Sequence, residues 1–267
     1  MKANEFLAHF LDQAYWVDKD KTVDRIIHGD GEKEVKNILV VWQNDMDAIE
    51  EAARIGADTI MTHEPTFYNH MYEVDRMREW GESHHQLAMA RKKIELMDKY
   101  GLTVVRNHDV WDRFPDIGIP QAWGRYLGLP DQWADNWERV QYRYDIPPTT
   151  LKAFARIVAA KAAELGEPHI QYFGPDDAVV SKVGVGMGCG CSIERFVRLG
   201  CDLSIVCDDA SCYWKDISWA REAGHSVIRV AHPTSEEAGM ITLARYINEQ
   251  LGISATYFRP EGRYKYI

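Results

Sequence analysis

Short apolar runs rich in valine and isoleucine alternate along this chain with longer amphipathic segments, and this alternation most constrains its fold. Most of the runs are continuously apolar, as expected for parallel strands that helices cover on both faces. The pattern predicts an α/β fold in which helices connect consecutive strands. The candidate strands are residues 38–43, 59–62, 103–106, 179–186, 203–207 and 226–230.

Helix signals stand between these runs. Asp45 is placed to cap a helix over 48–55, and a 3.6-residue period over 81–100 predicts a long helix. Gly56 and Gly101 occupy positions typical of the glycines that end helices.

The composition of the sequence changes over 114–148, where prolines and aromatic residues are frequent and neither a helical nor a strand period is clear. We interpret this region as the junction of two interlocked α/β lobes with largely parallel or mixed sheets. The predicted organisation is a lobe over 1–129 carrying His63, Glu64 and Asp112, a junction over 130–148, and a lobe over 149–267 carrying His232 and Glu236.

Composition excludes some classes of function. Lys and Arg number 31 against 41 Asp and Glu, and no basic run is present, so nucleic acid is not an expected partner. No apolar run reaches the ~18 residues of a membrane span, and the N-terminal segment does not resemble a secretory signal. Five cysteines, an odd number packed into 189–212, fit a reducing compartment. We therefore expect a cytoplasmic protein with no membrane partner.

Polar side chains follow most of the candidate strands. In open parallel sheets the carboxyl ends of the strands face one edge, where ligands bind. Such side chains therefore predict a metal or acid–base site, although a surface His–Glu pair at 63–64 and an Asx turn near 107–112 are simpler alternatives. The residues concerned are Asn44, Asp45, His63, Glu64, Asn107, His108, Asp109, Asp208, Asp209 and His232.

His232 and Glu236 are four residues apart, ahead of a helical pattern over 238–251. If the helix begins near Thr234 or the next residue, both side chains can reach one ion. A capping box between Thr234 and Glu237 is the alternative, and the two are compatible.

Two further motifs are less specific. The glycine-rich run 183–190 lacks a nucleotide-binding pattern and favours close strand–helix packing. Cysteine pairs 189/191 and 207/212 offer a thiolate metal site, but their spacing is not a standard zinc pattern and free cysteines are usually buried. Trp111 and Trp214 adjoin the strand-end segments and are candidates for stacking on a heterocycle.

The order of these motifs resembles the Nif3-like dinuclear metal centre hexameric proteins, part of which carries the name GTP cyclohydrolase 1 type 2. The resemblance rests on Thr-His-Glu-Pro at 62–65, His-Asp-Val-Trp-Asp at 108–112, the glycine-rich strand and the late His-x-x-x-Glu at 232–236, and it spans about 24–129 and 179–251. It implies two lobes with a metal cleft at strand carboxyl ends, and a homo-oligomer, specifically a hexamer.

The resemblance also implies a ligand set. Two divalent metal ions (Mn, Fe, Zn or Mg) would be held by His63, Glu64, Asp112, His232 and Glu236, with Asp112 and Glu236 as bridges. From the residues themselves, His108 or Asp109 is available for proton transfer or for support of the ligands. Glu64 replaces a histidine of the family motif, which favours harder ions or costs the second metal.

The sequence therefore predicts a dinuclear divalent-metal-dependent hydrolase that acts through a metal-bound water on a small-molecule substrate, with nucleotides among the candidates. The alternative is a non-catalytic metal-binding oligomer for storage, delivery, sensing or partner docking. A third is a metal-free binding protein in which Glu64 has broken the site.

Overall fold

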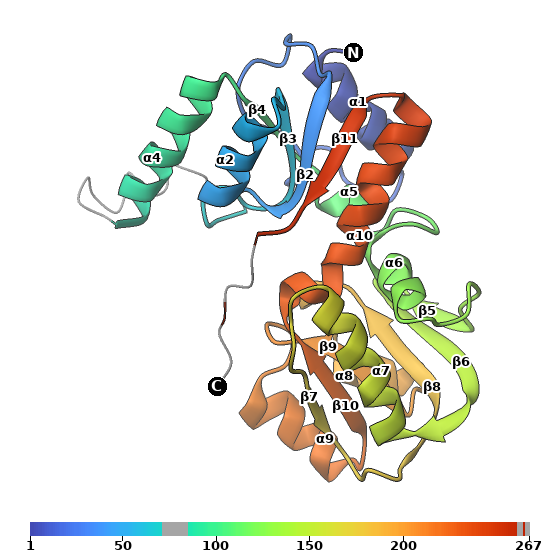
Figure 1. The fold of residues 1–267 in the computed structure, drawn as a ribbon. Coiled ribbons are helices and arrows are strands. Elements are labelled where there is room, and N and C mark those ends of the chain that lie inside the picture. Colours follow the sequence, from blue (N-terminus) through green and yellow to red (C-terminus); the bar gives the residue numbers. More distant parts are fainter. Residues whose placement is uncertain (71–84, 261–263, 265–267) are drawn as a thin grey trace. The chain divides into compact units, whose positions relative to one another are not determined.

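The computed structural model describes residues 1–70, 85–260 and 264 of the chain. Its contacts divide the described residues into two compact units. Unit 1 contains Met1–Trp111 and Met240–Pro260, and unit 2 contains Asp112–Gly239 with Tyr264. Each unit has its own sheet with helices packed on it (Figure 1), which confirms the predicted α/β class. The division into lobes at 129 and 149 stays a prediction.

Unit 1 is built on a five-stranded sheet whose central strands are parallel. The order is β1–β4–β3–β2–β11, and only β1 runs antiparallel to its neighbour. Every residue of β3 is buried, as expected for the central strand of a covered parallel sheet. The strands are β1 (Ile26–His28), β2 (Asn37–Gln43), β3 (Thr59–Glu64), β4 (Thr103–Arg106) and β11 (Ser254–Phe258).

Helices cover both faces of this sheet. Figure 1 shows α2 and α4 on one face and α1 with the end of α10 on the other. On the first face Ile49 and Leu87 belong to the same buried cluster as Ile60 of β3. The elements are α1 (Ala3–Gln13), α2 (Met46–Arg54), α4 (His85–Tyr100), α5 (Asp109–Asp112), α10 (His232–Tyr246) and η3 (Ile247–Leu251).

The predicted helix signals of unit 1 are confirmed. The Asp45 carboxylate accepts the Ala48 N–H at 3.0 Å and caps α2. Gly56 and Gly101 have φ of +67° and +62°, the left-handed conformation that ends a helix. The first four residues of the helix predicted over 81–100 lie outside the described residues.

Unit 2 is built on a six-stranded mixed sheet with the order β5–β6–β8–β9–β10–β7. Strands β8, β9 and β10 are parallel, and the remaining pairs are antiparallel. The strands are β5 (Asp135–Trp137), β6 (Gln141–Thr150), β7 (Gln171–Phe173), β8 (Val179–Gly186), β9 (Leu203–Cys207) and β10 (Ser226–Val230).

Two buried clusters cover the two faces of this sheet. Trp123 of α6 and Phe154 of α7 belong to the cluster on one face, while Phe196 of α8 and Ala220 of α9 belong to the other. The helices are α6 (Ile119–Tyr126), α7 (Leu151–Glu164), η1 (Gly188–Gly190), α8 (Ile193–Arg198), η2 (Tyr213–Ile217) and α9 (Ser218–Glu222).

All six candidate strands are present, but the region 114–148 contains more regular structure than its sequence indicates. It holds α6, β5 and most of β6. Tyr142 and Tyr144 are buried on one face of β6, and the register shifts between Asp145 and Thr149. That irregularity accommodates two consecutive prolines, which would otherwise argue against a strand.

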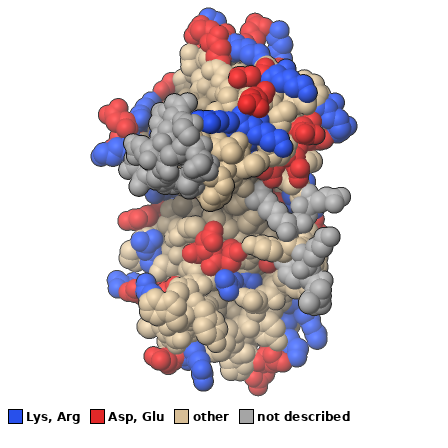
Figure 2. All heavy atoms as spheres, turned by 90° about the vertical axis from the view of Figure 1, so that its left-hand side faces the viewer, with Lys and Arg blue, Asp and Glu red and all other residues tan. Residues whose placement is uncertain are grey.

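The surface and the helices add two observations. On the face drawn in Figure 2, Lys and Arg side chains of the described residues are interspersed with Asp and Glu. Within the described part of the chain, no helix combines the length and the apolar character that crossing a membrane requires.

Candidate metal-binding groups

The carboxyl end of β3 carries His63 and Glu64, and both are buried. The hydroxyl of Thr62 donates to the Glu64 carbonyl at 2.9 Å and accepts the Asn44 N–H at 3.0 Å, which ties the ends of β2 and β3 together. The neighbouring parallel strand β4 ends just before His108, so its side chain reaches the same sheet edge.

The side chains of His63, Glu64 and His108 form a close group. The two imidazole rings stack with centroids 4.5 Å apart and planes at 17°. Glu64 Oε1 lies 3.9 Å from His108 Nε2, and Glu64 Oε2 lies 3.3 Å from Nε2 of His70, which the sequence did not suggest. One ligand atom from each of His63, Glu64 and His108 lies within 4.8 Å of the others. Two imidazoles and a carboxylate are a donor set suited to Zn²⁺, Mn²⁺ or Fe²⁺.

Two carboxyl groups hold His108 in place. Asp24 accepts the main-chain N–H groups of His108, Asp109 and Val110 at the start of α5. Asp109 accepts the Thr22 hydroxyl at 2.8 Å and lies 3.1 Å from His108 Nδ1. A carboxylate on Nδ1 leaves Nε2 directed at Glu64, the arrangement seen around metal-site histidines.

Burial has different consequences for these two acids. Burial raises the pKa of Asp24, against the opposing hydrogen bond from the His108 N–H. Burial also acts to raise the pKa of Asp109, but the hydrogen bonds from His108 and Thr22 outweigh it and hold that pKa well below its usual range. Asp109 is therefore an anion next to His108 at neutral pH.

The loop after β3 is anchored by a buried lysine of α4. Lys93 Nζ donates to the main-chain oxygens of Asn44 at 2.9 Å and Thr66 at 2.7 Å, and it lies 4.6 Å above the centre of the Tyr68 ring. Sequence reasoning missed Lys93 and Asp24. A lysine within an amphipathic helical pattern gives no sign of burial, and an isolated aspartate before a short strand carries no periodic signal.

In unit 2, His232 and Glu236 begin α10 and form a buried pair. His232 Nε2 lies 3.2 Å from Glu236 Oε1, one helical turn away. The helix begins at His232 itself, so the predicted start near Thr234 and its capping box with Glu237 are wrong. Glu167 takes the capping role instead, because its carboxylate accepts the Ala231 N–H at 2.9 Å.

The opposite side of the His232 ring faces other donors. Nδ1 lies 2.9 Å from Asp209 Oδ2 and 3.8 Å from Cys189 Sγ. Burial acts to lower the pKa of His232, but Glu236, Cys189 and Asp209 more than offset it and raise that pKa to about 12. The anionic surroundings thus favour a cation at this position.

The glycine-rich run packs closely, as predicted, and also contacts the His–Glu pair. A Cβ at Gly184 would lie 2.5 Å from the Phe196 ring of α8. A Cβ at Gly188 would lie 2.1 Å from Glu236 Oε1 and 2.2 Å from His232 Nε2. Only glycine permits η1 to approach the pair this closely.

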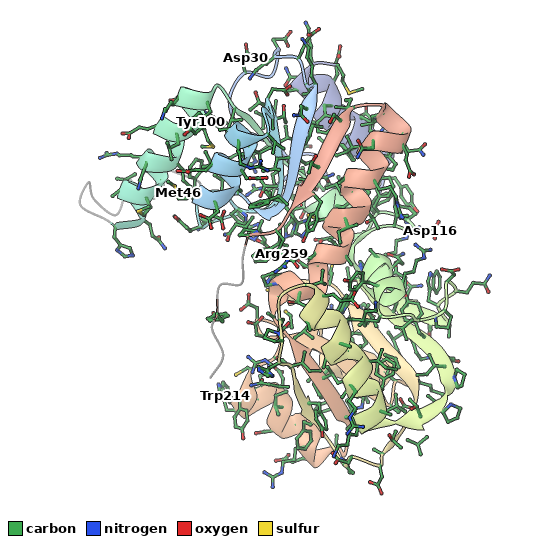
Figure 3. The ribbon with its side chains drawn as sticks, viewed as in Figure 1. Asp30, Met46, Tyr100, Asp116, Trp214 and Arg259 are labelled. Carbon is green, nitrogen blue, oxygen red and sulfur yellow. The ribbon has the colours of Figure 1, made fainter. Side chains whose placement is uncertain are left out.

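The structure also places the predicted residues Asp112, Trp111 and Trp214. Asp112 is buried and ends α5, the short helix that Asp109 begins. Trp111 is fully buried against Phe10 and Tyr246, so the prediction that it stacks on a heterocycle is wrong. Trp214 is 77% exposed and is labelled in Figure 3.

The fold and these groups define a class: α/β proteins that gather imidazole and carboxylate side chains at the carboxyl ends of parallel strands. The chain belongs to the Duf34/NIF3 (NGG1p interacting factor 3) family, whose model matches residues 1–259. The candidate ligands of both units lie within the matched residues.

Relatives and solved structures agree with this membership. A "GTP cyclohydrolase 1 type 2 homolog" of Archaeoglobus fulgidus is 22% identical over 85% of each chain. One of Clostridium perfringens with the same name is 23% identical over 84% of this chain and 82% of its own. A crystal structure of a Bacillus cereus protein related to NIF3 superposes with a TM-score of 0.77 at 13% identity, covering 100% of this chain and 99% of that one.

Proposed function

We propose that this chain is a divalent-metal-dependent hydrolase acting on a small-molecule substrate. The observation that carries the proposal is the group of His63, Glu64 and His108 at one sheet edge, with His108 Nδ1 held by an anionic Asp109. The relatives' name, GTP cyclohydrolase 1 type 2 homolog, makes purine nucleotides the first substrates to test.

The proposal includes two divalent ions. The buried donors are all imidazole nitrogens or carboxylate oxygens, a set that fits Mn²⁺, Fe²⁺, Zn²⁺ or Mg²⁺. Bound divalent ions supply Lewis acidity and lower the pKa of a water. As the family resemblance implies, His63, Glu64, Asp112, His232 and Glu236 would hold these ions, and Asp112 and Glu236 would be the ligands shared between them.

His108 is assigned to proton transfer at Nε2. Since Asp109 accepts from Nδ1, the neutral imidazole carries its proton on Nδ1 and presents a basic Nε2. This atom lies beside Glu64 and can accept a proton as the substrate is attacked. Asp24 acts as a positioning residue, because it fixes the main chain of His108.

The experiment combines metal analysis with a hydrolysis screen. The protein, purified without chelator or affinity tag, is analysed for bound metal and assayed against nucleotides and phosphoesters. We expect at least two ions per chain and metal-dependent hydrolysis, with His63→Ala and His232→Ala each losing at least one ion and the activity. His169→Ala, an exposed histidine outside these groups, is the matched control. Full activity in His63→Ala would contradict the proposal.

His108→Ala separates its assigned role from that of a ligand. If His108 transfers a proton, the variant keeps the bound metal and loses turnover by about 10²-fold or more. Loss of an ion in His108→Ala would instead make it a ligand.

A non-catalytic metal-binding protein is the second candidate. The specific observation in its favour is the burial of His63, His232 and Glu236, since closed sites are typical of structural metals. Two bound ions without hydrolysis of any substrate in the screen would favour this function.

A further inference from the structure

We propose that unit 2 binds one soft divalent cation, of the Zn²⁺ type, through Cys189 Sγ, His232 Nδ1 and Asp209 Oδ2. The ring nitrogen concerned is the one opposite the atom that faces Glu236. The site uses residues of unit 2 alone and contains a thiolate, so it goes beyond the nitrogen and oxygen ligands of the proposed hydrolase.

The donor spacing fits a tetrahedral ion. Zn–S and Zn–N bonds of about 2.3 and 2.1 Å at a tetrahedral angle separate sulfur and nitrogen by about 3.6 Å, and nitrogen and oxygen by about 3.3 Å. The structure has 3.8 Å between Cys189 Sγ and His232 Nδ1, and 2.9 Å between that nitrogen and Asp209 Oδ2. All three donor atoms lie within 4.8 Å of one another. Movements of a few tenths of an ångström would complete the coordination.

The backbone holds the three ligands in place before any ion binds. Cys189 lies in η1 after β8, Asp209 follows β9, and His232 follows β10, three adjacent parallel strands. The His232 N–H also donates to Asp208 Oδ1 at 2.7 Å. Ligands that follow adjacent strands on short connections lose little freedom on binding, which favours affinity.

The sulfur of Cys189 is accessible to an ion. Thiolate is the form of cysteine that binds metals, and the binding of the ion releases the thiol proton. Cys189 is exposed, so an ion has access to it from solvent.

The structure selects different cysteines from those that the sequence spacing suggests. Cys191 is buried and its thiol donates to the Met187 carbonyl at 3.4 Å. The main-chain N–H of Cys212 donates to Asp216 Oδ2 at 2.9 Å. The thiols that meet are Cys189 and Cys207, one from each of the two sequence pairs.

Cobalt titration of the full, metal-free chain tests the site. Co²⁺ bound by a thiolate absorbs in the near ultraviolet by charge transfer from sulfur, whereas Co²⁺ bound by nitrogen and oxygen shows only weaker visible bands. We expect the charge-transfer band to saturate at one Co²⁺ per chain. It should disappear in Cys189→Ser, and Asp209→Asn should bind Co²⁺ about tenfold more weakly.

Two controls separate this site from the proposed hydrolase. Cys212→Ser should keep the band, since Cys212 lies outside the donor set. His63→Ala removes a ligand of the hydrolase and should also keep the band, so either proposal can fail without the other. Absence of a charge-transfer band in the parent, or its survival in Cys189→Ser with the far-ultraviolet circular dichroism unchanged, would overturn the inference.

Discussion

At the scale of single residues, Asp24 holds the main chain at His108 in place. Its two carboxyl oxygens accept three N–H groups at the start of α5, and asparagine offers only one oxygen there. We expect Asp24→Asn to lower the free energy of unfolding by about 1–3 kcal/mol, measured in urea. Asp30→Asn, at an exposed position labelled in Figure 3, should change it by less than about 0.5 kcal/mol. Equal effects of the two changes would contradict this role.

At the same scale, the sequence predicted several residues of the candidate site but not the residues that hold them in place. His63, Glu64, His108 and Asp109 were found from their place after strands. Asp24 was not, because it is 84 residues away from the His108 N–H that it accepts. A contact between residues so far apart along the chain has no effect on local sequence patterns.

At the scale of elements, Lys93 joins α4 to the loops that follow β2 and β3. Lys93→Met keeps the aliphatic part of the side chain but leaves the buried main-chain oxygens of Asn44 and Thr66 without this donor. We expect a loss of about 3 kcal/mol in the free energy of unfolding. Lys92→Met, exposed on the same helix, is the matched control and should be near neutral. A loss in Lys92→Met as large as that in Lys93→Met would contradict the anchoring role.

A histidine between β9 and β10 predicts that the stability of the protein depends on pH. His225 precedes β10, and its Nε2 lies 2.7 Å from the Ser204 hydroxyl of β9. Burial lowers the pKa of His225 below its ordinary 6.5, so the unfolded chain takes up the proton first as pH falls. The stability that the neutral ring contributes is fully present above pH 6.5, and it is lost as the pH falls through the pKa of His225 in the folded chain.

The measurement compares parent and His225→Gln between about pH 8 and about pH 5. The parent should lose stability more steeply on acidification, since glutamine keeps a hydrogen-bonding group but does not titrate. Parallel pH profiles for the two proteins would be inconsistent with a titrating His225.

Strands were predictable where both faces are buried. The six predicted runs form central or parallel strands, and their continuous apolar sequence reflects cover on both sides. Five strands within the described residues were missed. One of them, β6, is an interior strand, but it contains two consecutive prolines and a register shift. The other four, β1, β5, β7 and β11, lie at sheet edges, and three of these have only three residues each. So short a segment carries no readable period, and its pairing is decided by the neighbouring strand.

At the scale of the whole molecule, metal binding should raise the free energy of unfolding. An ion that binds only the folded chain adds about 2.7 kcal/mol at a hundredfold excess over its dissociation constant. We expect the unfolding temperature to fall on chelation and to recover on adding back the native ion. Chelation without effect on the parent would argue against both proposed metal sites. The hexamer implied by family resemblance stays a prediction, and sedimentation should give six chain masses.

Local sequence patterns were enough to predict the class of fold, the central strands and the residues that follow them, because burial on both faces and the end of a strand are local properties. Which of those residues meet depended on the packing of the folded chain. It placed Cys189 with Cys207, put Asp209 and Glu236 on opposite nitrogens of His232, and buried Lys93 under a loop. These partners come from different strands and helices, and their distances depend on how the elements pack.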